Sequence, residues 1–134
     1  MKEFSLPLRV YIEDTDVGGI VYYVNYLKFM ERARTEFMRE LGYHTPAFID
    51  ENSMLVVYSA QVNYRRPARL DDTLLATASI ASLARSYIIF AQRVIRQGEV
   101  LCEGEIKVAC VSRNAMKPRA LPIDIREALQ KTTK

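Results

Sequence analysis

The sequence of 134 residues contains no tryptophan and one histidine, His44. A Ser-His-Asp or Cys-His catalytic arrangement would have to use His44, which lies in a polar turn after a predicted helix. One histidine and two cysteines eight residues apart in a predicted strand also make a poor tetrahedral zinc set. The scarcity of histidine therefore argues against a metal site and against histidine-dependent nucleophilic catalysis.

The two cysteines, Cys102 and Cys110, fall in one predicted strand, which would separate them by roughly 27 Å at ~3.4 Å per residue. At that separation they cannot form a disulfide with each other. The sequence also has no apolar stretch of about 18 residues and no apolar leader followed by a small-residue cleavage site. We therefore expect no transmembrane segment and a cytoplasmic location.

Charge of one sign is not concentrated anywhere, because the 19 basic and 16 acidic residues are distributed along the whole chain and leave a net charge of +3. The absence of a basic block predicts no nucleic-acid partner. A hydrophobic fraction of 49%, with five glycines and five prolines, is typical of a globular protein rather than a disordered one. The length suits one domain spanning residues 1–134.

The hydrophobic periodicity predicts a strand, a long helix, four further strands and a short final helix. Between Asn25 and Leu41 apolar residues recur every three or four positions, as on the buried face of a helix, and Gly42 suits its C-terminal end. From residue 54 the period changes to two. The predicted strands are 5–13, 54–66, 73–83, 86–97 and 100–112, and the predicted helices are 25–41 and 123–131.

This order of elements predicts an α+β domain in which one antiparallel five-stranded sheet packs against the apolar face of one long helix. The connections between the last four strands are short, which indicates antiparallel hairpins. A sheet of this kind has two exposed edges, and such edges favour pairing with a second copy of the chain. We therefore expect a homo-oligomer.

The segment between the first strand and the long helix, residues 13–26, concentrates acids, glycines and aromatic residues. A carboxylate held here would lie beside a helix N-terminus, whose free N–H groups stabilise negative charge developing on a carbonyl oxygen. Glycines would let the backbone approach a ligand closely. Asp14 and Asp16 could equally serve only to organise a turn or cap the helix, so composition alone leaves both roles open.

Residues 11–26 and 29–36 carry a more specific signal, because they resemble the signature of the 4-hydroxybenzoyl-CoA thioesterase family. Within this family the sequence is most similar to the Tol-Pal-associated, YbgC-like acyl-CoA thioesterases, and Tyr64 and the segments 67–72 and 117–122 resemble the same group. The resemblance implies a hotdog fold, with the sheet wrapped around the long helix. It also implies a dimer joined through its sheets, usually paired again into a tetramer, and hydrolysis of acyl-CoA without a metal or cofactor.

The resemblance further implies roles for individual residues. The second Asp of the motif, which is the family's catalytic carboxylate, falls on Asp16, and a polarising backbone N–H falls at or next to Tyr23. Gly19, Tyr22 and Tyr23 are then expected to contact substrate. Many YbgC-like members have His where this chain has Tyr23, so we expect Asp16 to act without a histidine. A carboxylate can attack the thioester carbon or take a proton from water, and the sequence leaves both routes open.

Coenzyme A is anionic, and several polar residues at predicted strand ends and turns are candidates to bind it. These candidates are Arg65, Arg66, Arg85 and Ser86, with Lys117 and Arg119 after the last strand. Each of them could instead be an ordinary surface residue. The strand tyrosines Tyr58, Tyr64 and Tyr87 are predicted first as core or interface residues.

Two other functions fit parts of the sequence. A hotdog dehydratase shares the fold but generally uses a histidine, which the position of His44 disfavours. A non-catalytic or weakly catalytic module could instead bind acyl-CoA or an acyl carrier protein and act through a protein partner. An intact Asp16 motif favours hydrolysis, with acyl-CoA as substrate and an acyl carrier protein as a further candidate partner.

Overall fold

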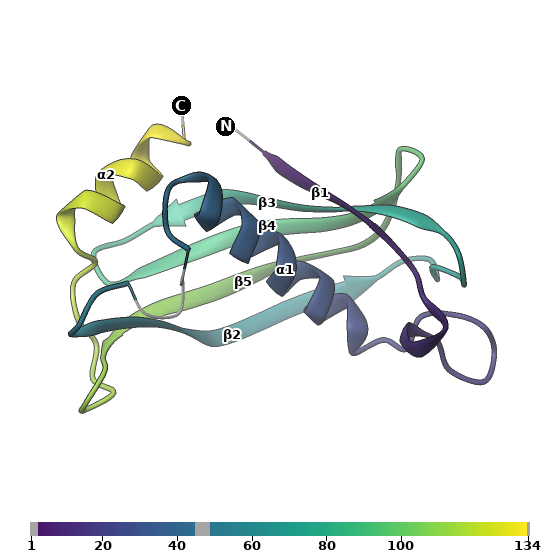
Figure 1. The fold of residues 1–134 in the computed structure, drawn as a ribbon, viewed down its shortest axis with the longest axis horizontal. Coiled ribbons are helices and arrows are strands. Elements are labelled where there is room, and N and C mark those ends of the chain that lie inside the picture. The colour runs from purple at the N-terminus through teal and green to yellow at the C-terminus, as the bar shows by residue number, and fades with distance from the viewer. Residues whose placement is uncertain (1–2, 45–48, 134) are drawn as a thin grey trace.

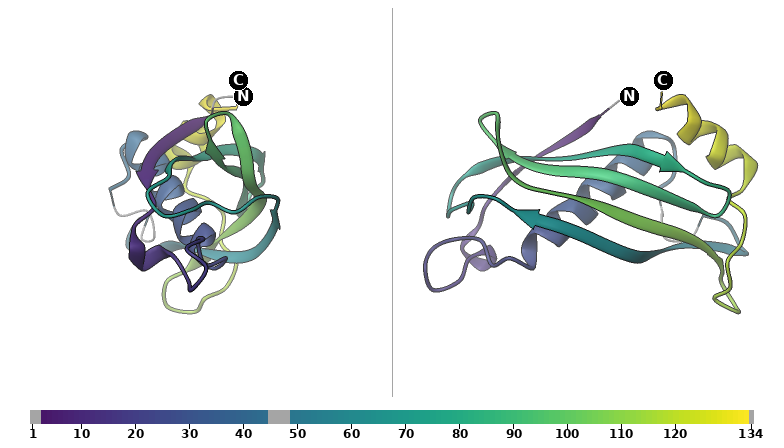
Figure 2. Two further views of the ribbon diagram at one scale, coloured as in Figure 1. Left: turned by 90° about the vertical axis from the view of Figure 1, so that its right-hand side faces the viewer. Right: turned by 180° about the vertical axis from the view of Figure 1, so that it is seen from behind.

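The computed structural model describes residues 3–44 and 49–133, which form a five-stranded antiparallel sheet and two α-helices. The elements are β1 (Phe4–Arg9), a 3-10 helix (Ile12–Asp14), α1 (Asn25–Glu40), β2 (Ser53–Tyr64), β3 (Thr73–Leu83), β4 (Tyr87–Arg96), β5 (Glu99–Ser112) and α2 (Ile123–Lys131). The strands are ordered β1-β3-β4-β5-β2, and α1 lies across one face of the sheet (Figure 1). Seen end-on, the sheet curls around α1 (Figure 2). The α+β prediction is thereby confirmed.

Helix α1 is buried along the apolar stripe that the sequence predicts. Its buried apolar residues include Tyr26, Phe29, Met30, Ala33 and Phe37. The Phe37 ring meets the rings of Phe4 in β1 and Phe90 in β4 edge-on, at centroid distances of 6.4 and 5.7 Å. Because burying a large apolar side chain contributes roughly 1.5–3 kcal/mol, this stripe fixes the helix on the sheet.

Both helices end close to their predicted boundaries. Leu41 is the C-cap of α1, and Gly42 follows with a φ of +101°, a left-handed conformation that glycine adopts without the steric cost of a Cβ. Helix α2 spans the predicted residues 123–131 and buries Ile125 and Leu129 completely. The four later strands also begin and end within two residues of their predicted limits.

The first strand is shorter than predicted, because β1 ends at Arg9 rather than at residue 13. Val10 still exchanges backbone hydrogen bonds with the segment before β3, donating to the Asp72 carbonyl at 2.9 Å. The Asp14 carboxylate then accepts from the Tyr11 N–H at 2.8 Å, and the Asp14 N–H donates to the Tyr11 carbonyl at 2.9 Å. This pair of bonds closes a 3-10 turn, so the expectation of a strand through residue 13 was wrong.

The two edge strands differ in how open they are to pairing. β1 has six residues and contains Pro7, which has no N–H to donate. β2 has twelve residues, contains no proline, and is exposed from Val57 through Gln61. Among the described strands β2 pairs with β5 alone, so its outer edge offers backbone groups for pairing. Within residues 3–44 and 49–133, no helix is long and apolar enough to cross a membrane.

Candidate active site

Asp16 lies in a tight turn, residues 15–21, that is closed by a bridge between Thr15 and Val21. The Asp16 N–H donates to the Ile20 carbonyl at 3.0 Å, and the Gly19 N–H donates to the Asp16 carbonyl at 3.0 Å. Gly19 has a φ of +75°, which explains the glycine at this position. The Asp16 Oδ1 accepts from the Gly18 N–H at 3.1 Å, and the described residues give its second carboxylate oxygen no hydrogen bond. The side chain is exposed.

Asp14, two residues earlier, has a different environment because it is 8% exposed. Besides the carboxylate bond to Tyr11, its carbonyl accepts from the Tyr22 N–H at 2.9 Å and from the Asn25 side-chain amide at 2.8 Å. Asn25 is the first residue of α1 and is itself buried. Asp14 therefore ties the 3-10 turn to the start of α1, which is the organising role that the sequence left open for both acids.

The start of α1 presents two backbone donors without an acceptor. The Tyr22 N–H bonds to Asp14, and the Asn25 N–H bonds to the Tyr22 carbonyl at 2.8 Å. Among the described residues, the N–H groups of Tyr23 and Val24 donate no hydrogen bond. Free N–H groups at a helix start are suited to stabilise negative charge on a substrate oxygen.

Four tyrosines gather around this helix start. Tyr23 packs edge-on against Tyr22 and Tyr64, at centroid distances of 5.2 and 5.9 Å, and Tyr26 packs against Tyr64 at 5.6 Å. The Tyr26 hydroxyl accepts from the Ala68 N–H at 2.9 Å, and burial raises the pKa of Tyr26. The sequence predicts Tyr64 as a core or interface residue; in the single chain it is 47% exposed and packs in this cluster, so it is not a core residue, and an interface role stays a prediction. Its place at the end of a predicted strand and its part in the resemblance to thioesterases are the signals that the sequence offers for this.

Arg65 and Arg66 follow β2 at the same end of the sheet. Their backbone N–H groups both donate to the Leu101 carbonyl, at 2.8 and 3.1 Å. The Arg65 side chain is ion-paired with Glu103, and the Arg66 Nε lies 2.8 Å from Glu99 Oε2. Both predicted coenzyme A ligands therefore lie near the tyrosine cluster, but each already has a carboxylate partner.

Arg85 and Ser86 lie at the opposite end of the sheet. The Ser86 carbonyl accepts from the Cys110 N–H at 2.8 Å, whereas Arg65 and Arg66 bond to Leu101. Nine residues along β5 separate these contacts, which is roughly 30 Å at ~3.4 Å per residue. One chain therefore does not bring all the predicted site residues together. Arg119 lies at this distant end as well, because its N–H donates to the Cys110 carbonyl at 2.9 Å.

Two adjoining hollows lie between α1 and the sheet. One has a volume of about 210 Å³, and its lining includes Val24, Leu27 and Ile106. The other, of about 200 Å³, is lined in part by Met38 and Leu55, and both are bordered by Glu31, Arg34 and Val57. Together they run along α1 from a point next to Tyr23. A larger hollow of about 430 Å³ is lined mainly by residues on the other face of the sheet, away from the helix start.

His44 lies just beyond the C-terminal end of α1, whose sixteen residues span about 24 Å at 1.5 Å per residue. It is therefore far from the helix start. Within the part of the chain that the structure describes, no three His, Cys, Asp or Glu side chains are grouped so that they could hold a metal ion. Cys102 and Cys110 are both buried and unpaired.

The sequence and the fold match those of known thioesterases. The model of the thioesterase superfamily matches residues 18–103, and the chain belongs to this family of enzymes. The chain is a thioesterase, and two of the relatives it matches are named as enzymes acting on acyl-CoA thioesters. It is 40% identical to the acyl-CoA thioesterase YbgC of Haemophilus influenzae over 126 residues, which is 93% of each chain. It is 44% identical to the acyl-CoA thioester hydrolase YbgC of Escherichia coli O157:H7, over 91% of this chain and 92% of the relative.

Solved structures confirm the hotdog fold that the resemblance implied. The 1,4-dihydroxy-2-naphthoyl-CoA thioesterase of Synechocystis superposes with a TM-score of 0.87 at 18% identity, with 98% of each chain covered. The gentisyl-coenzyme A thioesterase BH1999 has a TM-score of 0.84 at 30% identity and covers 93% of this chain and 98% of its own. These relatives do not favour the alternative of a non-catalytic binding module.

Proposed function

We propose that this thioesterase hydrolyses acyl-CoA to a free acid and coenzyme A, without a metal, and that Asp16 is its reacting carboxylate. The observation that carries the proposal is the loop leading into α1. This loop holds an exposed carboxylate, one oxygen of which accepts no hydrogen bond from the described residues, and, a few residues later, the Tyr23 and Val24 N–H groups, which donate none to those residues. A carboxylate and an anion-stabilising N–H pair are the two parts that acyl transfer requires.

Asp16 has two routes to hydrolysis. As a nucleophile, a carboxylate oxygen attacks the thioester carbon, the C–S bond breaks, and coenzyme A leaves as a thiolate that takes up a proton. Water then hydrolyses the resulting anhydride and restores the carboxylate. As a general base, Asp16 takes a proton from water while that water attacks the same carbon, and the departing thiolate is protonated. In both routes the Tyr23 and Val24 N–H groups stabilise the oxyanion.

The Tyr23 side chain is not required in either route. Its ring packs between Tyr22 and Tyr64, which suits a wall of the acyl site rather than a proton carrier. The hollow beginning at Val24 and Leu27 offers an apolar space for the acyl group. A backbone donor at position 23 functions alike with tyrosine or histidine.

The proposal includes a second copy of the chain. The outer edge of β2 is open, and a two-fold symmetric pair would join the two β2 strands antiparallel. Antiparallel pairing brings the Arg85 end of one sheet beside the Asp16 end of the other. This arrangement would bring together the two halves of the predicted site, which lie at opposite ends of the sheet in one chain. The assembly would be a dimer or a dimer of dimers.

The test is a hydrolysis screen of acyl-CoA thioesters from short to long chains, with aryl thioesters included and release of free thiol as the readout. We expect turnover of at least one of them, unchanged after exhaustive chelation. Light scattering on the same sample should give a mass of at least two chains. Absence of turnover on every thioester, or an active monomer at micromolar concentration, would overturn the proposal.

A further inference from the structure

The segment 67–72, which joins β2 to β3, is hydrogen-bonded to the turn that contains Asp16. The Val21 N–H donates to the Ala68 carbonyl at 2.8 Å, and the Leu70 N–H donates to the Gly19 carbonyl at 3.2 Å. The Ala68 N–H bonds in turn to the Tyr26 hydroxyl on α1, and Ala68 is fully buried. The position of this segment therefore determines how the turn 15–21 sits relative to the helix start.

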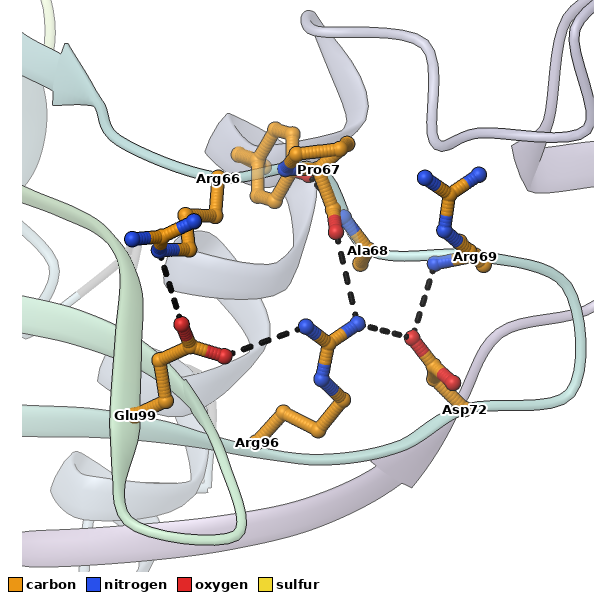
Figure 3. Close-up of polar contacts among 8 residues, drawn as sticks. Arg66, Pro67, Ala68, Arg69, Asp72, Arg96 and Glu99 are labelled. Carbon is orange, nitrogen blue, oxygen red and sulfur yellow. Dashed lines mark hydrogen bonds and ion pairs between the residues drawn. The ribbon is translucent and has the colours of Figure 1, made fainter.

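Arg96, the last residue of β4, connects both ends of this segment to the body of the sheet. One terminal nitrogen of its guanidinium donates to Asp72 Oδ2 at 2.7 Å and to the Pro67 carbonyl at 3.4 Å. The other donates to Glu99 Oε1 at 3.1 Å. Figure 3 shows Arg96 between the two carboxylates, with Arg66 on the far side of Glu99.

Asp72 passes this constraint on to the segment. The same Oδ2 that contacts Arg96 accepts from the Arg69 N–H at 2.8 Å, and Arg69 forms a bridge with Ile20 of the Asp16 turn. Burial raises the pKa of Asp72, but the hydrogen bonds from the Arg69 N–H and from Arg96 outweigh it, and the net pKa is lowered. The carboxylate is therefore charged at neutral pH, as its contact with the guanidinium requires.

The Arg96–Asp72 ion pair is less accessible to water than the Arg93–Glu3 pair on the same strand, although Glu99, the other carboxylate held by Arg96, is 42% exposed. The side chains of Arg96 and Asp72 are 26% and 23% exposed, whereas those of Arg93 and Glu3 are 41% and 35% exposed. A planar guanidinium can hold two carboxylates and a carbonyl in fixed directions, which the ammonium group of lysine cannot do. The geometry therefore suits a rigid clamp rather than a solvated surface pair.

We infer that Arg96 is a positioning residue for the Asp16 site, acting through segment 67–72. The Arg96 clamp, which is Arg96 with its partners Asp72, Pro67 and Glu99, holds the segment 67–72 in place. The segment in turn holds the turn 15–21 in position relative to the start of α1. The catalytic consequence rests on the proposed function, since it assumes that Asp16 reacts. The structural part, which is the coupling between Arg96 and the turn, stands independently of any activity.

The test compares Arg96→Met and Arg96→Lys with the matched control Arg93→Met, on the same strand and also paired with a carboxylate. Amide hydrogen exchange at Val21 and Leu70 reports the contacts between the turn and the segment, and the amides of β4 and β5 report global unfolding. We expect Arg96→Met to raise exchange at Val21 and Leu70 by about tenfold or more. Arg96→Lys should show a smaller rise, and Arg93→Met should show none.

Steady-state hydrolysis by the same variants tests the consequence for catalysis. Arg96→Met should lower kcat about tenfold and leave KM within about twofold, because a displaced carboxylate impairs the reaction more than binding. Unchanged exchange in folded Arg96→Met refutes the clamp, and raised exchange with an unchanged kcat refutes the positioning role. If Arg96→Met does not fold, the exchange and kcat of Arg96→Lys decide both points. A wild type that hydrolyses no thioester refutes the proposed function, while the exchange data still decide the clamp.

Discussion

Two neighbouring regions of the chain, the 3-10 helix ending at Asp14 and the turn containing Asp16, differ in how their acids are used. Asp14 is buried, and its carboxylate and its carbonyl accept three hydrogen bonds, of which one closes the 3-10 turn and the one from Asn25 reaches α1. Asp16 is exposed, and the described residues give its carboxylate a single bond from Gly18. The buried Asp14 carboxylate is engaged by a backbone N–H and is poorly placed to reach substrate. Asp16 is exposed, and one of its carboxylate oxygens accepts no hydrogen bond from the described residues, so that oxygen can react.

The largest expected effect is that of Asp16→Asn on turnover. Removing a nucleophile or general base should reduce kcat at least about 10²-fold, which is about 2.7 kcal/mol of barrier. KM should change little, and because the side chain is exposed, the free energy of unfolding should stay within about 0.5 kcal/mol of wild type. Steady-state hydrolysis and urea denaturation measure the two quantities. A folded variant that keeps most of its kcat would remove Asp16 from the mechanism.

The opposite result is expected for Asp14→Ala, which should act on stability. Loss of the carboxylate leaves the partly buried Tyr11 N–H without its acceptor, so the free energy of unfolding should fall by about 1–3 kcal/mol. Asp14→Asn should cost less, because its amide oxygen can still accept that bond. Urea denaturation of the two variants tests the order. Equal stability of Asp14→Ala and wild type would show that the buried acid is not structural.

Two arginines, Arg66 and Arg85, differ in the same way, because one side chain has a partner within the chain and the other has none among the described residues. Arg66 is ion-paired with Glu99, while the described part of the chain gives the Arg85 side chain no hydrogen bond or ion pair. Arg85→Met should therefore raise KM for acyl-CoA about tenfold, or 1.4 kcal/mol, with kcat unchanged. Arg66→Met should raise it less. An acyl-pantetheine substrate, which lacks the nucleotide, is the control, and an equal rise in its KM would contradict a nucleotide contact by Arg85.

The smallest expected effect is the pH dependence of stability that arises from a buried thiol. Unlike the exposed Asp16, the two thiols are buried and take no part in the proposed reaction. Burial raises the pKa of Cys102 to about 12. Between an unfolded pKa near 9 and that value, the Cys102 thiol ionises only in the unfolded chain, so its contribution to the free energy of unfolding should be constant below pH 9 and decline as the pH rises above it. Urea denaturation of wild type and Cys102→Ala at pH 8 and pH 10 measures the difference. A thiol that reacts rapidly with a thiol reagent in the native protein at pH 8 would contradict this burial.

The sequence predicted the elements well because their signals are local. The stripe from Tyr26 to Phe37 and the change to a period of two at residue 54 each reflect one buried face. The end of β1 was mispredicted because it depends on a hydrogen bond from the Tyr11 backbone N–H to the Asp14 carboxylate, which the hydrophobic pattern does not encode. The Arg96 clamp was missed for a similar reason. Its partners lie 24 and 29 residues away, at Asp72 and Pro67, and only the folded sheet brings them together.

Composition could not predict the distinct roles of the two acids either, because it left a structural and a catalytic role possible for each of them. Asp14 and Asp16 have the same chemistry and are two residues apart, so only their hydrogen bonds and burial distinguish them. The motif resemblance pointed to Asp16, and the structure supplies an independent physical reason to prefer it. The assignment of the chemistry to Asp16 is a prediction, and a comparison of the two acids in the reaction itself tests it.

The most direct comparison is single-turnover hydrolysis, with enzyme in excess over one acyl-CoA that the wild type accepts, by Asp16→Asn and Asp14→Asn. Under these conditions the rate reports the chemical steps rather than product release. We expect Asp16→Asn to be slower than wild type by at least about 10²-fold and Asp14→Asn to stay within about tenfold. Equal rates for the two folded variants, or a slower Asp14→Asn, would contradict the assignment of the chemistry to Asp16.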